Sequence, residues 1–241
     1  MSRRPPRNAA SKLIVALDCA TLRDALRIAT PLRGAVRHLK VGSPLFTAEG
    51  PVAIRKLRAL GFDIFLDLKF HDIPSTVEKS CRAAAQHQVW MLTVHASGQP
   101  QMLEAAAQGV RREASRLGVR RPLVVGVTIL TSVDMGQRTS GARSVKALAA
   151  ASQRAGLDGV VASAHEARWL RRQLGPRGLI VCPGIRLAGD SAADQRRIVS
   201  PHEALARGAD FLVVGRPITE AADPLASTRR ILHAMEGETQ C

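Results

Sequence analysis

Eight short apolar runs are the feature that most constrains how this chain can fold. Each run is rich in Val, Ile and Leu, and longer Ala-, Leu- and Arg-containing segments with helical spacing separate the runs. The runs cover residues 13–18, 38–42, 64–70, 91–96, 123–130, 159–163, 179–185 and 211–215. This alternation predicts repeated strand and helix units around a parallel sheet, and eight such units close a barrel. The expected fold class is therefore α/β, a (β/α)8 TIM barrel.

The length fits one such barrel. The chain has 241 residues, and a (β/α)8 barrel typically has about 250. Residues 1–11 are basic, contain two prolines and show no apolar periodicity, so they are predicted to form a disordered arm. Residues 12–241 contain no linker and are predicted to form a single domain. Thr21 is expected to cap the first helix, and Gly118, Gly156 and Gly208 are expected to end later helices.

Composition narrows the class of protein further. Hydrophobic residues make up 46% of the chain, but aromatic residues only 3%, so Ala, Val, Leu and Ile must fill the core. No apolar run approaches the roughly 18 to 20 residues of a membrane span, and the N-terminus lacks a signal-peptide pattern. Cys19, Cys81, Cys182 and Cys241 show no zinc-site spacing and are expected to be reduced thiols. We therefore expect a cytoplasmic protein without a membrane partner.

The formal net charge of +15 raises the alternative of a nucleic-acid-binding protein. The arginines, however, recur with helical spacing, as at Arg112 and Arg116, and no aromatic residues lie between them for base stacking. This pattern favours a solvated basic surface and no nucleic-acid partner. The excess positive charge should still attract an anionic substrate.

Charged residues lie within or directly after several predicted strands, where burial is costly unless charges are paired. They are Asp18, Lys40, Asp67, Lys69, Asp72 and Arg216. All lie toward the carboxyl ends of the strands, where barrels of this class build their active sites. The two-residue spacing of Asp67 and Lys69 predicts side chains on one face of a strand. Together with Lys40 and Asp72 they predict an array of alternating charge. A structural ion-pair network is the alternative, but it does not explain why the charges favour one end.

The segment DLKFHDIPSTV at residues 67–77 resembles the signature of the orotidine 5'-phosphate decarboxylase family, Asp-x-Lys-x-x-Asp-Ile-Pro-x-Thr. The fixed positions are present as Asp67, Lys69, Asp72, Ile73, Pro74 and Thr76. The similarity continues in the same order through VALD at 15–18, LKVG at 39–42, FTAEGP at 46–51, VTILTS at 127–132, CPGIR at 182–186 and VVGRPIT at 213–219.

The resemblance implies a carboxy-lyase of pyrimidine biosynthesis that converts orotidine 5'-monophosphate to uridine 5'-monophosphate and CO2 without a metal or organic cofactor. It implies that Lys69 donates the proton, and that Lys40, Asp67, Lys69 and Asp72 form a catalytic tetrad. In the family, the residues that match Asp72, Ile73 and Thr76 reach the partner subunit's site. A homodimer with composite active sites is therefore expected.

The resemblance also implies the substrate contacts. Asp18 and Lys40 would hold the ribose, and Thr131 would contact the pyrimidine, with the adjacent Ser132 as the alternative. Arg186, Gln195, Gly215 and Arg216 match the positions that bind the phosphate. This agrees with the usual phosphate site of such barrels, which is built from the loops after the seventh and eighth strands. Gly215 would allow close backbone approach, and Arg216 would offer a planar set of donors.

The implied chemistry explains why a lysine is needed. Loss of CO2 from the pyrimidine leaves an electron pair in an in-plane orbital that ring resonance cannot disperse. An ammonium group beside that carbon, here Lys69, can stabilise the charge and then protonate the carbon. His71 occupies a variable position of the signature, and His95 and His165 are interpreted as packing or capping residues rather than acid/base groups or metal ligands.

Two other functions remain open from the sequence. One is a metal-dependent sugar-phosphate decarboxylase of the same barrel superfamily, which shares a related Asp-x-Lys-x-x-Asp core. The other is a basic RNA-associated protein with an inactive barrel, against which the intact tetrad argues.

Overall fold

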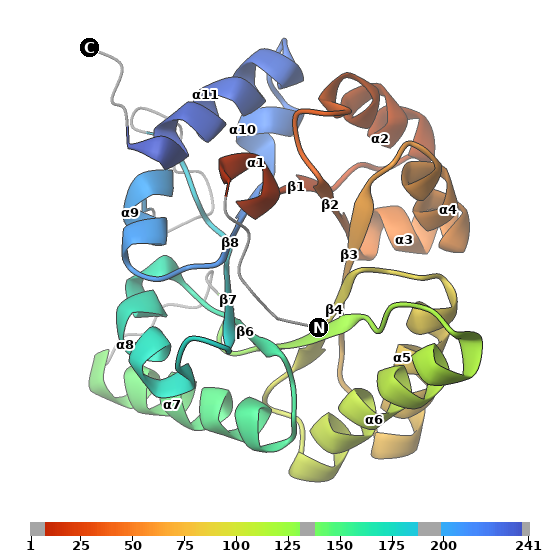
Figure 1. The fold of residues 1–241 in the computed structure, drawn as a ribbon, viewed down its shortest axis with the longest axis vertical. Helices are drawn as coiled ribbons and strands as arrows, with labels where there is room; N and C mark the ends of the chain where they lie inside the picture. Colours follow the sequence, from red (N-terminus) through yellow and green to blue (C-terminus); the bar gives the residue numbers. More distant parts are fainter. Residues whose placement is uncertain (1–7, 131–137, 188–198, 238–241) are drawn as a thin grey trace.

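The eight predicted strands close into a parallel barrel in sequence order (Figure 1). The computed structural model describes residues 8–130, 138–187 and 199–237. The strands are β1 (Leu13–Leu17), β2 (His38–Gly42), β3 (Asp63–Phe70), β4 (Met91–His95), β5 (Leu123–Val127), β6 (Gly159–Val161), β7 (Leu179–Cys182) and β8 (Phe211–Val214). Each strand pairs in parallel with the next, and β8 pairs with β1 to complete the ring. The predicted (β/α)8 fold is confirmed.

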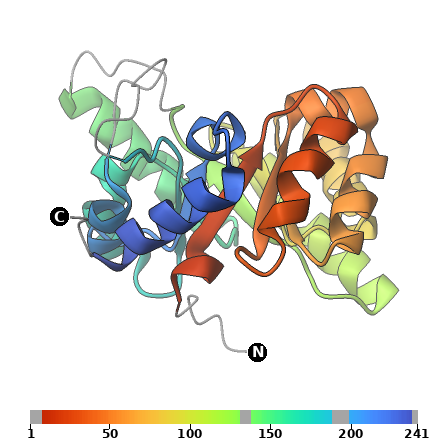
Figure 2. The same cartoon turned by 90° about the horizontal axis from the view of Figure 1, so that it is seen from above.

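Helices surround the barrel on its outer side (Figures 1 and 2). They are α2 (Leu22–Ala29), α3 (Ser43–Glu49), α4 (Pro51–Ala59), α5 (Pro74–Gln86), α6 (Pro100–Leu117), α7 (Arg138–Arg154), α8 (Ala164–Leu174), α9 (Pro201–Ala206), α10 (Arg216–Thr219) and α11 (Pro224–Glu236), with a 3-10 turn, η1 (Thr30–Leu32). The predicted cap at Thr21 is confirmed, because its side chain accepts the Asp24 N–H. Gly118, Gly156 and Gly208 follow helices with φ of 65°, 77° and 106°, as expected of helix ends. Within the described ranges, no helix is long and apolar enough to cross a membrane.

The N-terminal segment differs from the prediction at its end. A disordered arm was expected over residues 1–11, but residues Ala9–Lys12 form a short helix, α1. The Asn8 side chain accepts the Ser11 N–H at 3.0 Å and so satisfies one of the free donors of the first turn. Ala9 also packs against the apolar core. The structure therefore differs from the expected arm at residues 9–11, and residues 1–7 lie outside the described part of the chain.

The strands are apolar almost throughout because both of their faces are covered. In β1, Leu13, Val15 and Leu17 belong to the large cluster that includes residues of the helices. Ile14 and Ala16 belong to a second cluster formed with residues from other strands. Side chains alternate along a strand, so these two clusters occupy the helix-facing side and the barrel interior. The interior is thus filled with side chains.

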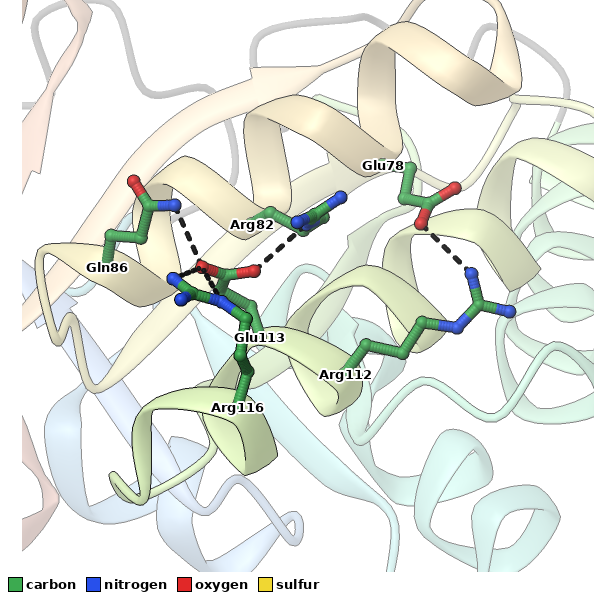
Figure 3. A network of polar contacts seen from close by, with 6 residues as sticks. All are labelled: Glu78, Arg82, Gln86, Arg112, Glu113 and Arg116. Atoms are coloured by element: carbon green, nitrogen blue, oxygen red, sulfur yellow. Dashed lines mark hydrogen bonds and ion pairs between the residues drawn. The ribbon is translucent and has the colours of Figure 1, made fainter.

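A network of ion pairs joins α5 to α6 (Figure 3). The Glu113 carboxylate, 1% exposed, accepts hydrogen bonds from Arg82 at 3.0 Å, Gln86 at 2.8 Å and Arg116 at 2.6 Å. These hydrogen bonds, with those from Arg116 and Gln86 first, lower the pKa of Glu113 to about 2 although burial opposes the shift. Part of the basic surface expected from the sequence is therefore paired with carboxylates.

Candidate active site

A pocket of about 520 Å³ opens at the carboxyl ends of the strands. Seven of the predicted site residues line it: Asp18, Lys40, Asp67, Lys69, Arg186, Gly215 and Arg216. Apolar side chains, including Phe65, Ile129 and Val161, form other parts of its wall. Charged groups are thus gathered beside apolar surface, where they interact more strongly than in open water.

Asp18, Lys40, Asp67 and Lys69 form a chain of alternating charge that begins just after β1 and crosses β2 and β3. The Lys40 Nζ atom lies 2.8 Å from Asp18 Oδ1 and 3.5 Å from Asp67 Oδ2. The Lys69 Nζ atom lies 2.9 Å from the same Asp67 Oδ2. The Asp67 side chain is 13% exposed and that of Lys69 is 33% exposed. A largely buried carboxylate therefore holds an ammonium group that remains accessible from the pocket.

The environment of Asp67 keeps its carboxylate charged. Burial by itself raises the pKa of this group, but the Lys40 and Lys69 ammonium groups outweigh that effect. Hydrogen bonds from Lys69 and Thr93 act in the same direction as the lysines, and the pKa of Asp67 is lower than usual. At neutral pH the carboxylate can therefore orient both ammonium groups.

Two glycines shape this part of the pocket. A Cβ atom at Gly42 would lie 2.7 Å from Asp18 Oδ1 and 2.8 Å from Lys40 Nζ, so any side chain there would disturb that ion pair. A Cβ atom at Gly215 would meet its nearest neighbour, Ala16 Cβ, at an ordinary 3.6 Å. Packing among the described residues does not require a glycine at 215, and the backbone of Gly215 lines the pocket.

Strand β3 is irregular where it carries the charged pair. Between its pairings with β4, β3 advances four residues, from Leu66 to Phe70, while β4 advances two, from Leu92 to Val94. Lys69 has a φ of 53°, a left-handed conformation that is uncommon for a residue with a side chain. The expected contact between Asp67 and Lys69 is present. The expectation assumed a regular strand, however, and β3 is irregular at these residues.

Thr93 on β4 faces this irregularity and was not identified from the sequence. Its hydroxyl accepts the Lys69 backbone N–H at 2.8 Å and donates to Asp67 Oδ1 at 3.0 Å. The signal available in the sequence was one polar residue inside the apolar run MLTV. Glu220, which follows α10 and lines the pocket, was also missed.

Three predicted site residues, Asp72, Ile73 and Thr76, closely follow Lys69 in the sequence. They do not line the pocket. Residues 71–76 are all exposed, and Ile73 is 63% exposed. The Asp72 carboxylate accepts the N–H of Ile73 at 2.6 Å. One chain therefore brings together three members of the predicted tetrad, while the fourth, Asp72, lies in the exposed segment before α5.

The residues expected to bind phosphate follow β7 and β8. Arg186 is 7% exposed and donates to the Ile185 carbonyl at 3.0 Å. Gly215 follows β8 and Arg216 is the first residue of α10, as in the usual phosphate site of such barrels. Thr131, its alternative Ser132, and Gln195 lie outside the described residues.

Three histidines, His71, His95 and His165, were excluded as metal ligands from the sequence. None of them lines the pocket. The His71 and His95 rings lie 5.4 Å apart, and burial together with His71 and Lys69 lowers the pKa of His95. His165 Nδ1 lies 3.1 Å from an Arg207 nitrogen. Among the residues with described positions, no three His, Cys, Asp or Glu side chains are grouped to hold a metal ion.

Fold and site together define a barrel enzyme with a lysine–carboxylate centre and arginines that line the same pocket. The chain belongs to the family described as "Orotidine 5'-phosphate decarboxylase / HUMPS family", which matches residues 11–231.

Proteins named orotidine 5'-phosphate decarboxylase are similar over almost their whole length. The one from Teredinibacter turnerae is 45% identical over 231 residues, which cover 93% of this chain and 97% of the relative. The one from Laribacter hongkongensis is 49% identical over 226 residues, which cover 92% of this chain and 91% of the relative. A solved structure of orotidine 5'-phosphate decarboxylase from Lactobacillus acidophilus superposes with a TM-score of 0.80 at 35% identity, covering 93% of this chain and 99% of that one.

Proposed function

We propose that this chain converts orotidine 5'-monophosphate to uridine 5'-monophosphate and CO2, as a carboxy-lyase of pyrimidine biosynthesis. The observation that carries the proposal is the alternating chain Asp18–Lys40–Asp67–Lys69 inside the pocket. Membership of the family and the names of relatives up to 49% identical support the choice of substrate.

Lys69 is the proton donor in this proposal. The bond from the pyrimidine ring to its carboxylate breaks, CO2 leaves, and the electron pair stays on the ring carbon. The Lys69 ammonium stabilises that pair and gives it a proton, forming the new C–H bond. The resulting amine regains a proton from solvent. Asp67 supports this step because its Oδ2 atom lies 2.9 Å from Lys69 Nζ and 3.5 Å from Lys40 Nζ, which fixes the position of both charges.

The remaining site residues bind the substrate. Asp18 and Lys40 hold the ribose hydroxyls, and Thr131 contacts the pyrimidine. Arg186, Gln195, Gly215 and Arg216 bind the phosphate. The pocket supports this assignment of the phosphate site, because Arg186, Gly215 and Arg216 line the same cavity as the two lysines. Charged donors of this kind form strong hydrogen bonds to phosphate oxygens.

The active enzyme is a homodimer with composite sites, in which Asp72, Ile73 and Thr76 complete the partner's pocket. Two observations support this: these residues do not line the pocket of their own chain, and the apolar Ile73 side chain is 63% exposed. In the proposed dimer, the partner subunit would cover Ile73 and remove its apolar surface from water.

Mixing two inactive variants tests the shared site. Lys69→Ala removes the proton donor, and Asp72→Ala removes the group given to the partner. In a heterodimer one site carries both lesions and the other carries neither. Subunit exchange should therefore restore about a quarter of wild-type activity if mixing is random and the sites are independent. No recovery after demonstrated exchange would mean that Asp72 serves its own chain.

The activity itself is tested by following the absorbance of orotidine 5'-monophosphate with purified protein and no added metal. Turnover that persists after exhaustive chelation supports the proposal. Loss of all turnover on chelation would favour a metal-dependent sugar-phosphate decarboxylase. No turnover at all, with RNA binding that persists at high salt, would favour the RNA-associated alternative.

The cellular setting is also part of the proposal. We place the enzyme in the cytoplasm, with residues 12–241 acting as one domain. Cys19, Cys81 and Cys182 are free thiols, which suits a reducing compartment. Cys241 lies outside the described residues.

A further inference from the structure

We propose that Thr93 is a positioning residue for the decarboxylation, because its hydroxyl ties the Asp67 carboxylate to the Lys69 backbone and so holds the Lys69 ammonium at the reacting carbon. The inference rests on the function proposed above. The predicted tetrad comes from β2, β3 and the segment after β3. Thr93 adds a residue from β4 to this group.

The hydrogen bonds of Thr93 close a ring around Lys69. The Lys69 backbone N–H donates to the Thr93 hydroxyl oxygen at 2.8 Å, and this hydroxyl donates its only proton to Asp67 Oδ1 at 3.0 Å. The second carboxylate oxygen, Oδ2, accepts from Lys69 Nζ at 2.9 Å. Lys69 is thus held at its backbone and at its ammonium group by one Thr–Asp unit. Rotation of the carboxylate would break both contacts to Asp67.

The backbone of β3 needs this hydroxyl. Where β3 advances four residues against two of β4, the ordinary pairing between the strands is interrupted, and Lys69 takes its φ of 53° there. The Lys69 backbone N–H donates to the Thr93 hydroxyl instead of to a carbonyl of the neighbouring strand. Thr93 is 0% exposed, so solvent cannot reach it to replace the lost contact. A strained backbone persists only where its surroundings hold it.

Thr93 also acts on the charge of Asp67. The charged groups that face this carboxylate are Lys40 from β2 and Lys69 from its own strand, and His95 lies further along β4. The Thr93 hydrogen bond is one of the contacts that lower the pKa of Asp67. Its removal should raise that pKa, and the acid side of the activity profile should move to higher pH.

The experiment compares Thr93→Val, which has nearly the same shape without a hydroxyl, with Thr93→Ser, which keeps the hydroxyl. We expect Thr93→Val to lower kcat about 10- to 100-fold, because small displacements of a reacting group are costly in rate. KM should change less than about threefold, since the phosphate contacts are untouched. Thr93→Ser should stay within about threefold of wild type in kcat. The acid limb of the pH profile should shift upward in Thr93→Val alone.

A matched control separates positioning from stability. Thr228 on α11 is also 0% exposed, and its hydroxyl donates to the Pro224 carbonyl at 2.8 Å. It does not line the pocket. Thr228→Val should therefore lose a comparable buried hydrogen bond, lower the melting temperature and leave kcat unchanged. If Thr93→Val does not fold, Thr93→Cys replaces it, because a thiol fills the space but is a weak donor and acceptor; its kcat should fall as well.

Three results would overturn the inference while leaving the proposed function intact: kcat of Thr93→Val within about threefold of an active wild type, a loss expressed only in KM, or a Thr93→Ser variant as slow as Thr93→Val. A wild-type protein without turnover would overturn the proposed function itself, and with it this role of Thr93.

Discussion

His38 at the amino end of β2 should make the stability of the barrel depend on pH. Its side chain is 5% exposed, its ring stacks on Trp90 with centroids 3.9 Å apart, and Phe211 packs against its edge. Within the described structure, its Nδ1 atom has no hydrogen-bond partner. Burial lowers the pKa of His38 to about 4, although Asp63 opposes the shift. The folded protein therefore carries this histidine in its neutral form.

The sign of the effect follows from where the proton binds. The pKa is about 6.5 in the unfolded chain and about 4 in the folded protein, so between these values the unfolded state binds more protons. The stability contributed by neutral His38 is complete above about pH 6.5 and is lost progressively toward pH 4. Between pH 7 and pH 5 the loss is about 2 kcal/mol, and its limit is about 3 kcal/mol.

Denaturant unfolding at fixed protein concentration, repeated from pH 7 to pH 5, measures this loss. His38→Phe keeps an aromatic ring against Trp90 but cannot titrate, so its free energy of unfolding should fall about 2 kcal/mol less than that of wild type over this range. His202→Gln, which removes an exposed histidine, should leave the wild-type slope unchanged. Parallel slopes for wild type and His38→Phe would refute the argument that a buried neutral histidine controls acid stability.

Three further changes test other parts of the molecule. Lys69→Ala should lower kcat/KM at least about 10²- to 10⁴-fold with little change in melting temperature, and retention within about tenfold would contradict its proposed role as proton donor. Arg216→Ala should impair turnover of the phosphorylated substrate far more than that of the nucleoside, whereas equal losses would place Arg216 outside the phosphate site. Glu113→Gln should weaken the contact between α5 and α6. Because the pKa of Glu113 falls to about 2 in the fold, its stabilising effect is present above about pH 4.5 and is lost toward pH 2. Melting temperatures between pH 5 and pH 3 should therefore fall less in the variant than in wild type, and identical slopes would show that Glu113 does not titrate as the structure indicates.

The strands were readable from the sequence because a barrel buries both of their faces, which makes each one a short apolar run. Seven of the eight predicted runs begin at the first residue of the strand, and the exception, β3, begins one residue earlier, at Asp63. The ends were less accurate. The run at 123–130 extends past Val127, where β5 ends, because Ile129 and Leu130 are apolar for a different reason: they line the pocket. Apolar pattern alone does not distinguish a strand from the wall of a cavity.

The charged part of the site was also readable, since a charge in a buried strand needs a partner. Asp18, Lys40, Asp67 and Lys69 meet as an alternating chain, whereas the array predicted from charge alone contained Asp72 and not Asp18. Thr93 could not be recognised in this way. Threonine is a common strand residue, so one threonine inside the apolar run of β4 is only a weak signal of a functional role.

The irregularity of β3 explains why the position of Asp67 was predictable and that of Lys69 was not. On its β2 side, β3 pairs regularly as far as Gly42 opposite Asp67, so the strand pattern places Asp67 beside Lys40. On its β4 side, regular pairing stops at Leu66 and resumes at Phe70, and Lys69 lies between. The position of Lys69 depends on the register between β3 and β4. This register is a tertiary property that the sequence of either strand alone does not predict. Thr93 bonds to both residues and so couples the regular side of β3 to the irregular one. The position of Lys69, the proposed proton donor, therefore depends on β2, β3 and β4 together.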